Sequence, residues 1–313
     1  MSRLHNILSK KELKKRMYLD TTERLTLSFY KYFNIINTQE YRNKIYKQFL
    51  KYNILGRVYI AEEGINAQIS VPLKNFTFLK NFLFQLSSSL HDIVINKALS
   101  NQKSFWVLSV KVKKNIVADG IQDFFFNPHD VGIYINAQEV NLMLKDQNVI
   151  FIDMRNSYEY KIGHFEHAIE IKSTTFREQL KKLVKKMEYA KHKRIVLYCT
   201  GGIRCEKATA WMRFHDFKYI YHIKGGIIGY IHNAKKNNLP ILFKGKNFVF
   251  DNRMSEKVSD DVIAFCQQCK NPSDVYVNCR NDLCHLLFIQ CKDCAVKFNY
   301  CCSKECMKKI KGF

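Results

Sequence analysis

Cysteine, proline and glycine are scarce over most of this 313-residue chain. None of the 11 cysteines precedes Cys199, so the first two thirds of the chain cannot be a disulfide framework. With 4 prolines and 12 glycines, long flexible linkers are not expected. No apolar, uncharged run reaches the roughly 18 residues of a membrane span, and the amino terminus lacks the apolar core of a signal peptide. These absences predict a cytoplasmic chain with reduced cysteines and no membrane contact.

Acidic residues are also few, with 28 Asp and Glu against 51 Lys and Arg, a formal net charge of +23. Such a charge suits a polyanionic partner such as nucleic acid. The basic residues, however, divide into 39 lysines and 12 arginines, alongside 25 asparagines. A compositional bias toward lysine, whose side chains then only solvate the surface, explains the charge equally well. Charge alone therefore leaves both interpretations open.

Apolar residues make up 47% of the chain, enough for packed cores, and the length predicts two or three domains. We interpret residues 1–24 as a basic surface arm. Residues 25–122 follow the order β-α-β-β-α-β, which is typical of a ferredoxin-like or acylphosphatase-like α+β domain. The expected strands are 26–33, 56–61, 65–71 and 104–114, and the expected helices are 40–53 and 73–86.

Residues 133–240 alternate apolar strands with helices, which predicts a doubly wound α/β domain. Continuous apolar runs predict strands at 149–154, 194–199 and 219–223, and 176–190 has the spacing of an amphipathic helix. A Cys-rich segment, 245–313, completes a multidomain α/β protein.

Cys199 lies where the second of these strands ends and a helix is expected to follow. At the carboxyl end of a parallel strand, the N–H groups and dipole of the next helix stabilise a thiolate. Two glycines let the backbone curl so that N–H groups point inward, and Arg204 adds positive charge at the rim. We therefore expect Cys199 and Arg204 to be catalytic; the alternative is a buried structural cysteine. The anion cradle comprises Thr200, Gly201, Gly202 and Ile203.

The motifs IDMR, GHFEHAIEI, YCTGGIR and KGGIIGY resemble the rhodanese family in order and spacing over about 90 residues. The resemblance implies that Cys199 carries a persulfide. It also implies structural roles for Asp153, Arg155 and Glu159, with Arg155 held by carboxylates. A related phosphatase family has a longer loop sized for phosphate, so the shorter loop here favours sulfur. Cys205 either resolves a persulfide or disulfide on Cys199 or is a small helix residue facing the sheet.

Nine of the eleven cysteines lie between Cys266 and Cys306. Closely spaced cysteine pairs in a reduced compartment are typical of metal sites, and eight thiolates fill two tetrahedral zinc sites. The spacing does not fix whether the pairs bind sequentially or interleave, and His285 can replace one thiolate. Disulfides, idle thiols and an iron–sulfur cluster are the alternatives. The expected ligands of structural zinc are Cys266, Cys269, Cys279, Cys284, Cys291, Cys294, Cys302 and Cys306.

The whole chain resembles the bacterial tRNA uridine hydroxylases of the rhodanese superfamily. The resemblance rests on GRVYIAEEGINAQISV, YCTGGIRCEKA, GKNFVFD and NDLCHLLFIQC. It implies conversion of the wobble uridine of tRNA to 5-hydroxyuridine with molecular oxygen and a reductant. Cys199, as thiolate or persulfide, would then act at the active site. We find no flavin or nicotinamide fingerprint and no spacing for non-haem iron, so no organic cofactor is expected.

A tRNA substrate implies aromatic stacking near the cysteine loop, for which Tyr30, Phe105 and Trp106 are candidates if they are not core residues. The turn residues Glu62, Glu63 and Asn66 either contact substrate or serve as a polar turn. The basic run 181–194 and the N-terminal arm are candidate phosphate contacts or solvated faces. The alternatives for the chain are a rhodanese-type sulfurtransferase or persulfide carrier and a non-enzymatic binding module.

Overall fold

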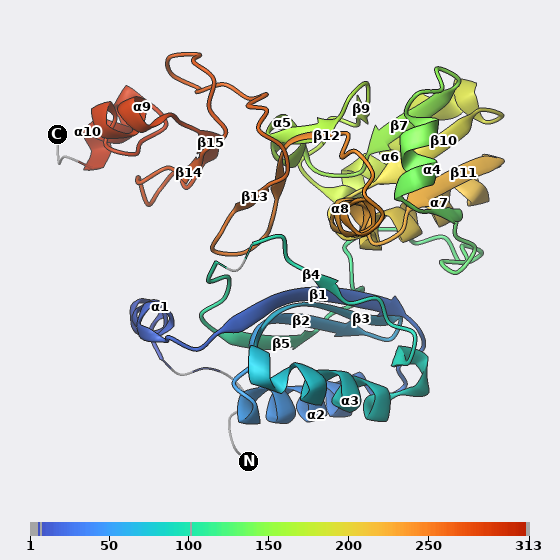
Figure 1. Ribbon diagram of the computed structural model, residues 1–313, viewed down its shortest axis with the longest axis horizontal. Helices are drawn as coiled ribbons and strands as arrows, with labels where there is room; N and C mark the ends of the chain where they lie inside the picture. Colours follow the sequence, from blue (N-terminus) through green and yellow to red (C-terminus); the bar gives the residue numbers. More distant parts are fainter. Residues whose placement is uncertain (1–5, 7, 101, 311–313) are drawn as a thin grey trace.

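The computed structural model describes residues 6, 8–100 and 102–310. The chain forms an N-terminal α+β domain, an α/β domain and a Cys-rich module (Figure 1). These match the expected fold class. Among the described residues, no helix combines the length and the apolar character that crossing a membrane requires.

The N-terminal domain is a five-stranded sheet in the order β4-β1-β3-β2-β5. The hairpin β2–β3 and its neighbour β1 are antiparallel, as expected, whereas β5 lies parallel to β2 at one edge. The short strand β4 takes the other edge, beside β1, and was missed in the sequence because two residues carry no periodicity. The strands are β1 (Arg24–Tyr32), β2 (Leu55–Ala61), β3 (Gly64–Pro72), β4 (Asn96–Lys97) and β5 (Leu108–Val112).

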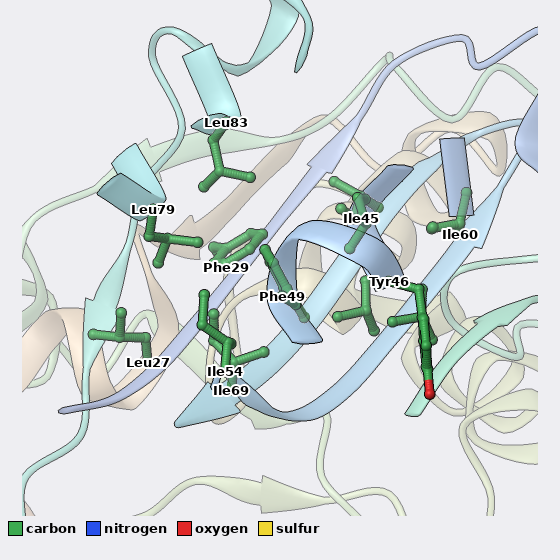
Figure 2. Close-up of a cluster of buried hydrophobic side chains, with 14 of the residues drawn as sticks. Leu27, Phe29, Ile45, Tyr46, Phe49, Ile54, Ile60, Ile69, Leu79 and Leu83 are labelled. Carbon is green, nitrogen blue, oxygen red and sulfur yellow. The ribbon is translucent and has the colours of Figure 1, made fainter. Parts of the chain in front are cut away.

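Helices α2 (Thr38–Lys51) and α3 (Phe76–Leu86) cover one face of this sheet (Figure 1). Side chains alternate along each strand, so the apolar half of β1 and β3 meets these helices. Phe29 and Ile69 pack there with Phe49 and Leu83 of the helices (Figure 2). The other half of each strand is polar and faces the α/β domain. Two 3-10 turns, Leu73–Asn75 and Ser88–Leu90, flank α3.

Within the basic arm 1–24, residues Lys10–Leu19 form a helix, α1, of which only Met17 is buried. Ser9 caps its first turn by accepting a hydrogen bond from the backbone N–H of Glu12. At the other end, the Lys103 ammonium donates to three carbonyl oxygens, those of Met17, Tyr18 and Asp20. These contacts satisfy backbone groups that a helix end leaves unpaired.

The α/β domain contains a parallel sheet in the order β6-β11-β10-β7-β9. Helices α6 and α7 pack on one face, and α4 and α8 pack on the other. The strands are β6 (Ile133–Ile135), β7 (Val149–Asp153), β9 (Ile169–Glu170), β10 (Arg194–Tyr198) and β11 (Tyr219–Ile223). The helices are α4 (Ala137–Met143), α5 (Ser157–Lys161), α6 (Phe176–Met187, continued by the 3-10 turn Glu188–Ala190), α7 (Ile203–Phe214) and α8 (Gly226–Lys236).

The Cys-rich module joins the α/β domain through a shared sheet. Strand β12 (Phe243–Phe248) pairs with β8 (Gly163–Phe165) of the α/β domain and with β13 (Ser255–Lys257). The expected start of the module at residue 245 therefore lies inside β12. The hairpin β14 (Tyr276–Asn278) and β15 (Leu287–Ile289) follows, then α9 (Lys292–Lys297) and α10 (Lys304–Ile310).

A buried lysine fastens the N-terminal domain to the α/β domain. The side chain of Lys207, on α7, is 3% exposed and pairs with the carboxylates of Glu63 and Asp119. Its ammonium lies 3.0 Å from Asp119 and 5.1 Å from the centroid of the Tyr32 ring. Glu63 also accepts the backbone N–H of Ile116 at 2.8 Å. One cation thus neutralises two carboxylates where three segments of the chain meet.

Replacing Lys207 by Met should destabilise the protein by about 3–5 kcal/mol, because two carboxylates lose their buried cation. The matched control is Lys182→Met on α6, where an exposed pair with Glu178 contributes less than about 0.5 kcal/mol. The free energy of unfolding in urea measures both. Equal losses for the two variants would contradict a stabilising role for the buried cation.

Candidate active site

The cysteine loop connects the central strand β10 to α7. The backbone N–H of Gly202 donates to Cys199 Sγ at 3.2 Å. Gly202 has a left-handed φ of +101°, and a Cβ there would lie 2.7 Å from the hydroxyl of Tyr30. At Gly201 a Cβ would meet no atom within 4 Å, so of the two loop glycines only Gly202 is required by the backbone conformation. At Gly226, which opens α8, a Cβ would lie 2.5 Å from the carbonyl oxygen of Cys199, so the start of α8 approaches the cysteine loop closely.

The loop stabilises a thiolate on Cys199. Burial acts to raise the pKa of this thiol, but it is outweighed by a hydrogen bond from the Cys205 thiol, the charge of Arg204 and the backbone N–H groups of Cys205 and Gly202. Together these lower the pKa of Cys199 to about 6. Burial and the neighbouring Cys199 raise the pKa of Cys205 well above its usual value. Cys205 therefore stays a thiol and acts as a hydrogen-bond donor to the thiolate.

Two buried arginines lie behind the loop, each with its own carboxylate. Arg204 makes a two-point contact with Glu159, at 2.7 and 2.9 Å, and is buried rather than at a solvent-exposed rim. Arg155 pairs with Asp153 at 2.6 Å and also donates to the carbonyl oxygen of Gly163. The expectation that carboxylates hold Arg155 agrees with the Asp153 contact, but Glu159 binds Arg204 instead. Glu159 thus orients the cation that stabilises the thiolate.

A cavity of about 510 Å³ lies between the cysteine loop and the polar face of the N-terminal sheet. Cys199, Thr200, Gly201, Ile203 and Arg204 line one wall. The hydroxyl of Thr200 is buried and has no hydrogen-bond partner among the described residues, so it is available to a ligand. The sheet supplies the opposite wall, with Tyr30, Arg57, Tyr59, Asn66 and Gln68. The volume falls within the range of about 300–1,000 Å³ that small-molecule sites occupy.

The expected aromatic residues separate into two groups. Tyr30 and Phe105 line the cavity, whereas Trp106 packs against Lys14 of α1, with the ammonium 4.7 Å from its ring centroid. A third aromatic residue, Phe250, also lines the cavity and was not identified from the sequence. Its side chain is 45% exposed, and its ring centroid lies 6.0 Å from the guanidinium carbon of Arg204. Phe250 belongs to the run GKNFVFD, one of the segments that carry the resemblance of the whole chain, and this membership is the sequence feature that could have identified it.

The polar residues at the turn between β2 and β3 differ in their surroundings. Glu63 binds Lys207 and is structural, and Glu62 is exposed. Asn66 lines the cavity. None of the lysines in 181–194 lines this cavity. Two of them bond to neighbouring backbone carbonyls, Lys182 to Lys172 and Lys186 to Glu170.

Eight cysteines of the Cys-rich module form two groups of four, and the pairs interleave. In each group the sulfur atoms all lie within 4.8 Å of one another. A tetrahedral site with metal–sulfur bonds of about 2.3 Å has sulfur–sulfur edges of about 3.8 Å. The sulfur–sulfur distances in the structure include 3.6 Å for Cys269–Cys291 and 3.7 Å for Cys284–Cys302, so each group can hold a metal ion. The groups are Cys266, Cys269, Cys291 and Cys294, and Cys279, Cys284, Cys302 and Cys306; Cys301 and His285 belong to neither.

The rate of Cys199 alkylation by iodoacetamide should rise with pH around a midpoint near 6, because only the thiolate reacts. Cys205→Ala should raise the midpoint by about one pH unit, since a hydrogen bond to the thiolate is lost. Cys205→Ser, which retains a hydroxyl donor, is the matched control. Peptide-resolved mass spectrometry separates Cys199 from the other cysteines. A midpoint near 9 in the unsubstituted protein would contradict the assignment.

Comparisons with known proteins cover the chain from end to end. Family models match at 24–116 (UPF0176 acylphosphatase like domain), 136–233 (Rhodanese-like domain) and 244–307 (Rhodanase C-terminal). A tRNA uridine(34) hydroxylase of Buchnera aphidicola subsp. Acyrthosiphon pisum (strain APS) is 68% identical over 313 residues, 100% of this chain and 97% of its own. The protein of the same name from Enterobacter sp. (strain 638) is 54% identical over 307 residues, covering 98% and 88%. The chain belongs to the tRNA uridine(34) hydroxylase family.

Proposed function

We propose that this chain is a cytoplasmic enzyme that hydroxylates the wobble uridine of tRNA to 5-hydroxyuridine. The observation that carries the proposal is the stabilised thiolate of Cys199 in the wall of a cavity of about 510 Å³ between two domains, which has room for a nucleobase. The high identity to proteins named tRNA uridine(34) hydroxylase over almost their whole length supports the same reaction. In this proposal Cys199 is the catalytic nucleophile, and Arg204 stabilises it.

The thiolate attacks C6 of the uracil ring, and the electron pair of the C5–C6 double bond moves onto C5 and the adjacent carbonyl. The carbon C5 becomes nucleophilic and takes one oxygen atom as the bond of molecular oxygen breaks. A two-electron reductant and two protons convert the other oxygen atom to water. Loss of the C5 proton and cleavage of the C6–sulfur bond restore the ring and the thiolate. The enzyme is thus an oxidoreductase of the monooxygenase type. We assign the nucleophilic step to a thiolate, because that is the state that the loop stabilises.

The surroundings of the cavity suit an RNA strand with one base turned outward. An extruded base can stack on Phe250, Phe105 or Tyr30, as unstacked bases do on aromatic side chains. Two further hollows, of about 430 and 390 Å³, share Asn96 with the cavity wall. Their linings include Lys97, Lys224 and Lys236. These lysines place positive charge where the phosphates flanking an extruded nucleotide would pass.

We propose that the two cysteine groups hold structural zinc. All-thiolate sites with four ligands favour zinc, and no ligand position remains open for catalysis. Zinc supplies folding energy to a segment whose own apolar core is small. Interleaved pairing also ties the segment before β14 to α9, through Cys266, Cys269, Cys291 and Cys294. The second site ties the loop of the β14–β15 hairpin to α10, through Cys279, Cys284, Cys302 and Cys306.

The purified protein should contain two zinc ions per chain, measured by elemental analysis. Cys266→Ser should remove one of them, because a tetrahedral site loses one of its four thiolates. Cys301→Ser is the matched control and should retain both, since Cys301 lies outside the two groups. Loss of zinc from Cys301→Ser but not from Cys266→Ser would contradict the pairing.

Cys199→Ala should abolish 5-hydroxyuridine in tRNA. The test is nucleoside mass spectrometry of tRNA from a deletion strain complemented with the wild-type or the variant gene. Oxygen-18 gas supplied to the purified enzyme should place the label in the new hydroxyl group. Undiminished product from Cys199→Ala would refute the proposal. Loss of thiolated nucleosides in place of 5-hydroxyuridine would identify a sulfurtransferase instead.

A further inference from the structure

The wall of the cavity opposite Cys199 carries a chain of amide hydrogen bonds that the reaction chemistry leaves unexplained. Asn66 Nδ2 donates to the carbonyl oxygen of Ile116 at 3.1 Å. Gln68 Nε2 donates to Asn66 Oδ1 at 2.6 Å. Both side chains are half-buried, and both line the cavity. They are alternate residues of β3, so they project from the same face of the sheet.

The hydrogen bonds fix which way each amide points. A backbone carbonyl only accepts, so the nitrogen of Asn66 must face Ile116 and its oxygen must face Gln68. The nitrogen of Gln68 then faces Asn66, and Gln68 Oε1 is left at the end of the chain. Among the described residues, none donates a hydrogen bond to Gln68 Oε1. The cavity wall therefore presents a hydrogen-bond acceptor of fixed orientation.

A hydrogen-bond donor lies beside this acceptor. Arg57 is the partner of Gln68 in the adjacent strand β2, and it also lines the cavity. Its guanidinium carbon lies 5.9 Å from the ring centroid of Phe105, and no ion pair joins it to a carboxylate of the described residues. Gln68 Nε2 carries a second hydrogen, which is a further donor on the same amide. The wall thus offers an acceptor with donor groups near it.

We propose that this wall is a base-recognition site for a pyrimidine that has an N–H between two carbonyl groups, which is the edge of uracil. The inference rests on the proposed function, and it names the residues that select the base. The N3–H of uracil donates to Gln68 Oε1, and Arg57 donates to one of the flanking carbonyl oxygens. Cytosine has a lone pair at N3, which would face the Gln68 oxygen without a proton between them.

The recognition wall meets the reactive loop at one edge of the cavity. Tyr30 is the partner of Asn66 in strand β1, and its hydroxyl is the atom that a Cβ at Gly202 would meet. Ile116, which anchors the amide chain, belongs to the same apolar cluster as Ile203 of the loop. A base whose N3 edge meets the sheet therefore occupies the space next to Cys199.

Gln68→Leu removes the acceptor at nearly constant volume. Two anticodon stem–loop RNAs, with uridine or cytidine at the wobble position, serve as probes. Protection of Cys199 from iodoacetamide measures binding of each hairpin, and 5-hydroxyuridine formation gives kcat and KM. Gln68→Leu should raise KM and weaken the preference for uridine over cytidine by about tenfold, with kcat less affected.

The matched control is Gln85→Leu, the same substitution at an exposed position of α3 on the far side of the sheet, and it should behave as wild type. Wild-type preference in Gln68→Leu would overturn the inference. If the wild-type enzyme forms no 5-hydroxyuridine, the proposed function fails. The protection measurements then still decide whether Gln68 distinguishes the two bases.

Discussion

The structure depends on helix α7, which stabilises the thiolate and holds the N-terminal sheet in place. Its first turn carries Arg204 and the N–H groups that face Cys199. The residues that follow, Glu206 and Lys207, point to the N-terminal domain. Glu206 accepts the hydroxyl of Tyr30 at 2.8 Å, and Lys207 binds Glu63 and Asp119. Because α7 contacts both the cysteine loop and the N-terminal sheet, the two walls of the cavity are held together next to Cys199.

Buried charge at this site is balanced pair by pair. Glu159 holds Arg204, and Asp153 holds Arg155, so both guanidinium groups have a carboxylate partner before the thiolate is considered. The sulfur adds a negative charge that is shared among Arg204, the Cys205 thiol and backbone N–H groups. Such an arrangement lowers the pKa of the cysteine without leaving an uncompensated ion in the interior. A neutral uracil can then enter the cavity without bringing a further charge.

The sequence was most informative where a pattern is local. Apolar runs predicted β7, β10 and β11, and the loop motif placed Cys199 at a strand end. The two-residue strands β4 and β9 were missed because they are too short to show a period. Long-range pairings were also beyond reach: the interleaving of the cysteine pairs, the Glu159–Arg204 contact and the burial of Lys207 each join distant segments. Phe250 was missed because it reaches the cavity from the Cys-rich module, outside both domains that form the walls.

The central claim is that the Cys199 thiolate adds to a base held in the cavity between the domains. A stem–loop RNA with 5-fluorouridine at the wobble position tests it most directly, because fluorine cannot leave C5 as a proton does and the C6–sulfur adduct is retained. The account predicts a covalent RNA–protein complex that survives denaturation and maps to Cys199 by peptide mass spectrometry. The claim would be contradicted if no adduct formed while the same enzyme preparation hydroxylated the unmodified hairpin.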